Sequence, residues 1–267
     1  MHRGFNLESI HFNEPQFYYE IGLKLYNDRK DKIRLALDNF ISTDGSIDGT
    51  QMQANWFPQT KVHIFISHSH DDEYFAISLS GWLFETFRIE SFIDSCIWGY
   101  AGDLLRDIDN RYCYRQQTNT YNYTDRNHST SHVHMMLSTA LSMMIDNTEC
   151  LFFLNTPSSI ASSDIKSKIN KTASPWIYNE IAISQLVRKK SREVHRPKVK
   201  FYSESLNLEI KKSLTATFDV DLNHLGEVNV KILNDWQKLG TKSYAYDALD
   251  ILYELVPAPE QSDFING

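Results

Sequence analysis

Short hydrophobic runs alternate along this chain with longer amphipathic stretches, and this alternation predicts the fold. Residues 61–67, KVHIFIS, form a run with β-branched side chains that is typical of a strand buried on both faces. Residues 72–88 follow with apolar side chains on one side of a helix. The same logic predicts further strands at 89–94 and 150–155 and further helices at 133–145 and from 174.

The two ends of the chain carry different patterns. Residues 14–41 have a helical period, Pro15 suits a first turn, and the Gly-, Asp- and Ser-rich stretch that follows is typical of a linker. We therefore expect an N-terminal helical extension and linker over 1–58. An α/β domain is expected over 59–240, with an inserted loop at about 111–132, and a C-terminal helix and tail over 241–267. Weaker strands are expected at 198–202 and 214–220, and helices near 223–238 and at 242–255.

Strand–helix alternation predicts a parallel sheet covered by helices. In open sheets of this kind ligands bind outside the carboxyl ends of the strands, where the strand order reverses. The loop after residues 61–67 is such an end.

Composition narrows the class of protein. With 42% hydrophobic residues, 23% charged residues and a net charge of -7, the chain is typical of a soluble globular protein and not of one that binds nucleic acid. Three cysteines without a C-x-x-C pair argue against a disulfide framework and for a reducing compartment. No apolar leader and no apolar stretch of about 20 residues is present, so we expect a cytoplasmic protein without a membrane contact.

Residues 64–73, IFISHSHDDE, allow two interpretations. His68, His70 and Asp72 form H-x-H-x-D, which is similar to the first ligand box of metallo-β-lactamase-type hydrolases, although that box needs a histidine where this chain has Glu73. The alternative is the rim of a cleft, followed by acidic residues in the first turn of a helix. We favour the rim, with Ser67, His68 and Ser69 near a ligand and no metal.

A second histidine group lies in the expected insertion. His128 and His132 are four residues apart and His134 follows, which allows a zinc pair if the segment is helical. The simpler interpretation is that these histidines lie in a loop and at the start of a helix and bind no metal.

The helix from residue 174 carries Trp176 and Glu180, four residues apart and therefore on one face. An indole stacks on a flat heteroaromatic ring, and a carboxylate stabilises positive charge that develops at a carbon atom when its bond to a leaving group breaks. Asp94 is a further candidate for substrate binding. In the expected loop 95–103 that follows it, Trp98, Gly99 and Gly102 suit a mobile lid over an aromatic ligand.

Taken together, IFISHSHDDE, FIDSCIWGYAGDLL and SPWIYNEIA resemble the first strand, the second strand with its BB loop, and the W-x-x-x-E signature of TIR (Toll/interleukin-1 receptor homology) domains. The resemblance covers about residues 61–240 and implies a flavodoxin-like parallel sheet. It also implies an NAD nucleosidase or ADP-ribosyl cyclase that takes NAD as substrate, with Glu180 as catalytic residue. Ser69 and His70 stand where some TIR domains carry arginines, so phosphate contacts do not carry over there.

For prokaryotic members, the resemblance implies antiviral defence through NAD depletion or through an ADP-ribose-derived signal sensed by a downstream effector. It further implies activation by assembly into a homo-oligomer. Three rival classes stay open. One is a non-catalytic TIR scaffold that recruits partners, and another is a nucleoside deoxyribosyltransferase-like enzyme that acts on nucleosides. The third, which we favour less, is a metallohydrolase that uses His68, His70 and Asp72.

Overall fold

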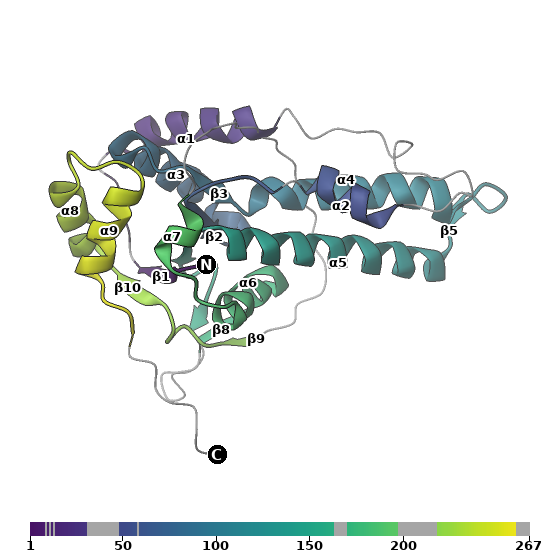
Figure 1. Cartoon of the computed structure of the whole chain (residues 1–267). Coiled ribbons are helices and arrows are strands. Elements are labelled where there is room, and N and C mark those ends of the chain that lie inside the picture. The colour runs from purple at the N-terminus through teal and green to yellow at the C-terminus, as the bar shows by residue number, and fades with distance from the viewer. Residues whose placement is uncertain are drawn as a thin grey trace, which may run out of the picture.

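The computed structural model describes residues 1–8, 10, 12, 14–30, 48–57, 59–162, 170–196 and 218–259, and for residues 28–30, 96–100 and 162 the backbone alone. In this part of the chain the main sheet has five parallel strands (Figure 1). In spatial order they are β10 (Gly226–Val228), β1 (Arg3–Glu8), β6 (Cys150–Asn155), β2 (Ile64–Ser67) and β3 (Ser91–Ile93).

Helices flank this sheet, so the predicted α/β class is confirmed (Figure 1). They are α1 (Pro15–Lys30), α2 (Gly49–Trp56), α3 (Glu73–Phe87), α4 (Ser95–Ile108), α5 (Tyr123–Asn147), α6 (Pro175–Leu186), α7 (Arg192–His195), α8 (Val230–Leu239) and α9 (Tyr246–Leu255). A 3-10 turn, η2 (His70–Asp72), leads into α3, and a π-helical turn, η3 (Asp109–Cys113), follows α4. None of the described helices is long and apolar enough to cross a membrane.

The strands predicted at 61–67, 89–94 and 150–155 are confirmed as β2, β3 and β6. Every residue of β2 and β3 is buried, as are the first five residues of β6. The continuous apolar runs are read correctly because strands covered on both faces do not alternate. The helices predicted at 72–88 and from 174 are α3 and α6, and Ser174 caps α6 by accepting from the Ile177 N–H.

The predicted boundary near residue 58 is wrong in one respect: the segment before it contributes a strand to the main sheet. β1 pairs with β6 on one side and β10 on the other, so the N-terminal segment is not a separate helical extension. Its six residues, RGFNLE, hold two large apolar side chains and give too short a pattern to identify a strand. The part of the predicted helix beyond Lys30 lies outside the described residues.

Helix α1 also belongs to this domain because it packs closely on α3. A Cβ atom on Gly22 would lie 1.9 Å from the backbone oxygen of Ile77, and one on Gly81 would lie 1.9 Å from that of Tyr18. The two glycines therefore let the helix backbones touch.

The strand order of the main sheet can be compared with the flavodoxin-like order that we expected from the resemblance. Numbered along the chain, the five strands lie in the order 3-2-4-1-5, whereas flavodoxin has 2-1-3-4-5. The arrangement is compatible with a flavodoxin-like sheet in which β1 fills the place next to the outermost strand, β10.

The predicted loop 95–103 is wrong, because these residues form the first half of α4. Asp94 starts the helix: its carboxylate accepts from the Ser95 N–H at 2.7 Å. The glycines of this segment cost helix stability but do not break it when a cap and an apolar face support it. Trp98 and Gly99 therefore lie in a helix and not in a loop.

The predicted insertion at 111–132 is partly a hairpin. Strands β4 (Tyr114–Arg115) and β5 (Thr120–Tyr121) pair antiparallel, and α5 then starts at Tyr123, ten residues before the predicted helix. Asn122 caps α5 through the Asp125 N–H, which explains how a polar, Asn-rich stretch begins a helix.

Near the C-terminal end, β10 occupies part of the helix predicted near 223–238, and α8 starts at Val230. The helix predicted at 242–255 is α9. A three-stranded antiparallel sheet joins β7 (Ala161–Ser162), β8 (Asn170–Thr172) and β9 (Phe218–Val220). The strand predicted at 198–202 and the first part of the one predicted at 214–220 lie outside the described residues.

Candidate functional site

The candidate site lies at the carboxyl ends of β2 and β6, the neighbouring strands at which the strand order reverses. From β2 the chain continues to β3 on one side, while β6 and the strands beyond it lie on the other. This is the position at which open parallel sheets bind ligands. The side chains gathered here come from the end of β2, the start of α4 and the second turn of α6.

Glu180 reaches the end of β2 from α6. The Ser67 hydroxyl donates a hydrogen bond to Glu180 Oε2 at 2.6 Å, and both residues are 0% exposed. The position of Glu180 follows from the start of α6: with Ser174 as cap and Pro175 in the first turn, the second turn faces the sheet.

Asp94 lies beside this pair at the start of α4 and is also 0% exposed. Its carboxylate accepts from the Ser95 N–H at 2.7 Å and from the His68 N–H at 3.3 Å. It also contacts Nδ1 of the His68 side chain. The carboxyl groups of Asp94 and Glu180 lie within hydrogen-bonding reach of each other.

Burial sets the protonation of this group. Burial raises the pKa of both carboxyl groups, and the charge of Asp94 raises the pKa of Glu180 further. Burial also lowers the pKa of His68 to about 4, so the imidazole is neutral at pH 7. Two carboxyl groups in contact, with a neutral histidine beside them, do not both ionise readily.

More acids surround the pair. Glu73 accepts from the Tyr26 hydroxyl at 2.8 Å and from the Ser95 hydroxyl at 3.1 Å. Asp72 accepts from the Thr156 hydroxyl at 2.6 Å. Within the described residues, no lysine or arginine forms an ion pair with Asp94 or Glu180. Sequence reasoning missed Glu73, which carries no signal beyond its place in the first turn of a helix.

Trp176 stands one turn before Glu180, but its ring packs against α5. It is half-buried and meets His134 edge to face, with ring centroids 5.5 Å apart and an interplanar angle of 82°. The structure thus brings Glu180 together with Ser67, His68 and Asp94. The role of Trp176 in stacking on a ligand stays a prediction.

The remaining predicted site residues are placed less directly. Ser69 is 7% exposed, and its hydroxyl has no hydrogen-bond partner within the part of the chain that the structure describes. Trp98 and Gly99 follow Asp94 in the first turns of α4, where the structure describes the backbone alone. The predicted mobile loop is therefore replaced by a helix start that carries Asp94.

The three residues of the H-x-H-x-D motif have different surroundings in the structure. His68 is fully buried against Asp94, His70 is exposed on η2, and Asp72 is held by Thr156. The described residues contain no cluster of three or more His, Cys, Asp or Glu side chains suited to a metal ion.

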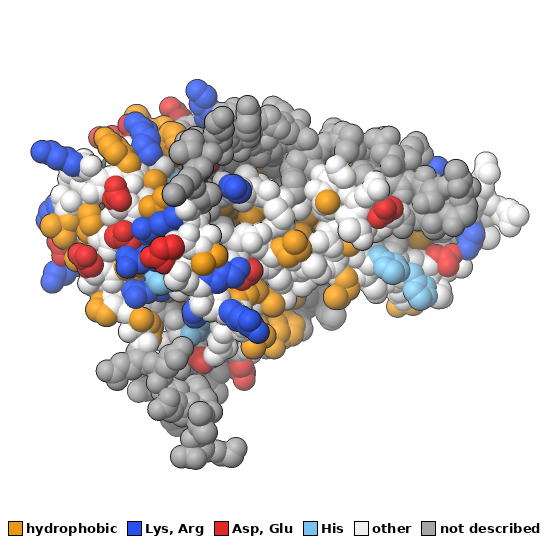
Figure 2. Space-filling model, viewed as in Figure 1, with side chains coloured by type: hydrophobic (Ala, Val, Ile, Leu, Met, Phe, Trp, Pro, Cys, Tyr) orange, Lys and Arg blue, Asp and Glu red, His pale blue; other side chains and the backbone are white. Residues whose placement is uncertain are grey.

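The second histidine group lies on α5. His128 and His132 are exposed, and Figure 2 shows histidine side chains in pale blue on the surface over the end of α5 next to β5. His134 contacts Trp176 instead. The zinc-pair interpretation thus has two exposed side chains on one helix and nothing else to support it.

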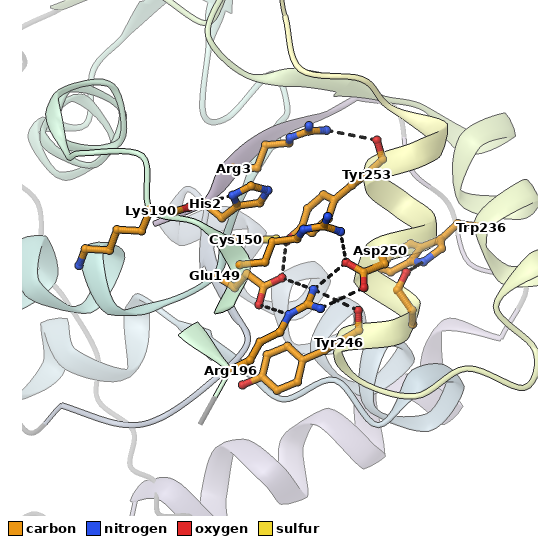
Figure 3. Close-up of polar contacts among 12 residues, drawn as sticks. His2, Arg3, Glu149, Cys150, Lys190, Arg196, Trp236, Tyr246, Asp250 and Tyr253 are labelled. Atoms are coloured by element: carbon orange, nitrogen blue, oxygen red, sulfur yellow. Dashed lines mark hydrogen bonds and ion pairs between the residues drawn. The ribbon is translucent and has the colours of Figure 1, made fainter. Parts of the chain in front are cut away.

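A second buried polar cluster, which we call the Glu149 cluster, lies at the opposite, amino end of the strands (Figure 3). Glu149 accepts from Arg196 at 3.0 and 2.8 Å and from the Tyr253 hydroxyl at 2.9 Å. Arg196 also donates to Asp250, and Tyr253 contacts the thiol of Cys150 at 2.7 Å. The cluster ties α7 and α9 to the start of β6.

Sequence reasoning missed the Glu149 cluster because its members are far apart in the chain and share no spacing. On the surface over α7 and α9, basic and acidic side chains are interspersed, in keeping with matched charges below (Figure 2). Removing one member of such a buried pair leaves an uncompensated charge and is costly, and charges that are already paired leave little for a ligand.

Comparisons with protein-family models, with curated proteins and with solved structures find no match to this chain.

Proposed function

We propose that this protein is an enzyme that cleaves the bond between nicotinamide and ribose in NAD, with Glu180 at the ribose C1 carbon. The observation that carries the proposal is the position of Glu180: it is fully buried at the strand switch point, hydrogen-bonded to Ser67 and without a lysine or arginine partner among the described residues. A carboxylate without a fixed cation is available to a cation that forms during the reaction.

The chemistry fits a single carboxylate. Breaking the bond leaves positive charge on the ribose C1 carbon, which an adjacent carboxylate stabilises. Nicotinamide departs as a neutral molecule, so its departure needs no acid. Ser67 would hold the carboxylate of Glu180 in place through its hydroxyl.

The TIR resemblance supports the same proposal, since Trp176 and Glu180 stand as W-x-x-x-E at the start of α6. On the basis of the same resemblance, we also propose that the protein acts in antiviral defence and that a downstream effector senses its product. Glu180 is closed off from solvent in this structure, which agrees with activation by assembly. We therefore expect specific activity to rise with protein concentration.

The test follows NAD and nicotinamide by chromatography at high protein concentration. Glu180→Gln keeps the size and hydrogen-bonding capacity of the side chain but removes its charge, so turnover should fall by ~10²-fold or more. Glu254→Gln on the exposed face of α9 is the matched control and should leave turnover unchanged. The mass of the adenine-containing product distinguishes linear from cyclic ADP-ribose.

Equal turnover in the wild type and Glu180→Gln would remove Glu180 from the mechanism. No turnover in wild type at any concentration would favour the scaffold interpretation. Release of a base from nucleosides, with NAD left intact, would favour the deoxyribosyltransferase-like interpretation.

A further inference from the structure

Asp94 and Glu180 differ in the hydrogen-bond donors that reach them. Asp94 faces three nitrogens: the backbone N–H groups of Ser95 and His68, and Nδ1 of the His68 ring. Glu180 has one donor, the Ser67 hydroxyl on Oε2. Its other oxygen, Oε1, is fully buried and has no donor among the described residues.

This difference decides which member of the pair holds a proton. Several N–H donors favour the ionised form of a carboxyl group, whereas a buried oxygen without a donor favours the protonated form. Asp94 is therefore the carboxylate, and Glu180 is the acid that donates to it. Placing the proton on Glu180 also satisfies the contact between the two carboxyl groups, which two anions would not.

The surroundings leave this pair in an acidic environment. Glu73 from α3 and Asp72 from η2 contribute negative charge, and His68 is neutral. In the described part of the chain no lysine or arginine pairs with Asp94 or Glu180. A positively charged group is the ligand that complements such a site.

We propose that Asp94 determines specificity for a positively charged N-riboside: it shares one proton with Glu180 at rest, and the pair releases that proton when the cationic ring binds. This inference rests on the proposed function for the class of ligand. It distinguishes the oxidised nicotinamide ring, which is a cation, from the reduced ring, which is neutral and leaves the proton in place.

The released proton makes Glu180 the carboxylate that the reaction needs. The bond between C1 and the ring nitrogen breaks, and its electron pair stays on the nitrogen, so nicotinamide leaves neutral. Water then bonds to C1 and gives its proton to Glu180, which restores the shared proton. Each turnover therefore starts and ends with one proton on the pair.

The first measurement is isothermal titration calorimetry of the whole protein with carba-NAD. In this analogue a carbon atom replaces the oxygen of the ribose ring that carries nicotinamide. The bond between C1 and the nicotinamide nitrogen is therefore stable, and the nicotinamide ring keeps its positive charge. Titrations at pH 7 in two buffers of different ionisation enthalpy give the protons released per ligand bound. We expect about one proton for wild type and none for Glu180→Gln, because a glutamine has no proton to release.

Specificity is measured by comparison with NADH. Wild type should bind carba-NAD at least about tenfold more tightly than NADH, and Asp94→Asn should lose most of this preference. Asparagine also caps helices, so this variant should keep the start of α4. The matched control, Asp103→Asn, changes a carboxylate of α4 that pairs with Arg106, and should leave the preference unchanged.

The outcomes separate this inference from the proposed function. Binding of carba-NAD without proton release would overturn the inference and leave NAD cleavage standing. No binding of carba-NAD at a protein concentration that gives NAD turnover would overturn the inference alone, and no binding together with no turnover at any concentration would overturn both. Infrared spectra of the free protein test the resting proton directly: a carbonyl band of a protonated acid should shift with ¹³C-labelled glutamate and vanish in Glu180→Gln. Its absence from wild type would overturn the shared proton, whatever the calorimetry gives.

Discussion

Glu180 and Glu149 are two buried glutamates at opposite ends of the same sheet, and their surroundings are opposite in charge. Glu149 is 1% exposed and accepts two hydrogen bonds from Arg196 and one from Tyr253. Glu180 is 0% exposed and accepts one, from Ser67. Burial alone therefore does not distinguish a carboxylate with a structural role from one that is available to a ligand, as we propose for Glu180. The presence or absence of a fixed cation does.

The largest expected effect comes from removing the cation that compensates Glu149. Arg196→Met leaves Glu149 buried without its cation, so the free energy of unfolding should fall by ~3 kcal/mol. Urea denaturation followed by circular dichroism measures the change. Arg188→Met is the control, because Arg188 is exposed and should cost less than ~0.5 kcal/mol. Equal effects of the two variants would mean that the cation does not hold the Glu149 cluster together.

The same substitution in both glutamates sharpens the contrast. Glu149→Gln loses charge-assisted hydrogen bonds and should lower the free energy of unfolding by ~2 kcal/mol. Glu180→Gln should change it by less than ~1 kcal/mol, because an amide still accepts from Ser67 and donates to Asp94. Parallel urea denaturation of the two variants is the measurement. A larger loss in Glu180→Gln would make Glu180 a structural residue.

The pH dependence of stability gives a third contrast. Because the pKa of Glu180 is raised in the folded protein, its proton is retained there after the unfolded chain has lost it. Stability from this group is therefore full below the usual glutamate pKa of about 4.3 and falls as pH rises, by at most ~1.4 kcal/mol per pH unit.

The difference in free energy of unfolding between wild type and Glu180→Gln isolates the titration of the Asp94–Glu180 pair, since the titrating groups outside the pair are common to both proteins. Measured from pH 5 to 8, wild type should lose stability relative to the variant. A difference that is constant with pH would mean that the Asp94–Glu180 pair holds no extra proton in the folded protein between pH 5 and 8.

The smallest effect concerns a neutral member of the Glu149 cluster. Tyr253→Phe removes the hydroxyl that donates to Glu149 and contacts the thiol of Cys150, but it leaves the Arg196 pair intact. We expect a loss of ~1 kcal/mol in thermal or urea denaturation. Tyr244→Phe, on an exposed side chain, is the control. A loss as large as that of Arg196→Met would mean that the hydroxyl, not the cation, compensates Glu149.

The sequence predicts those elements whose local pattern matches their burial. The runs that became β2 and β6 are apolar throughout because both strands are covered on both faces. The start of helix α6 is predictable because Ser174 is a favourable N-cap residue and Pro175 suits the first turn. The same elements place Glu180 and Ser67, so the core of the candidate site is predictable from sequence.

Other features depend on contacts that no local pattern records. Strand β1 is defined by its pairing with β6 and β10, which lie far along the chain. The contact of Asp94 with Glu180 arises where the start of α4 meets α6, although each residue alone looks like an ordinary polar position. The Glu149 cluster likewise exists only once α7 and α9 pack on the start of β6.

The position of β1 has a consequence for how the chain folds during synthesis. Arg3 of β1 pairs with Cys150, and Phe5 pairs with Gly226, so β1 is made long before either neighbour is available. Pairings over such separations slow folding and leave apolar strand edges exposed in the meantime. A nascent chain that has not yet completed β6 should therefore depend on chaperones, and truncation before Gly226 should leave β1 with an open edge and a tendency to aggregate.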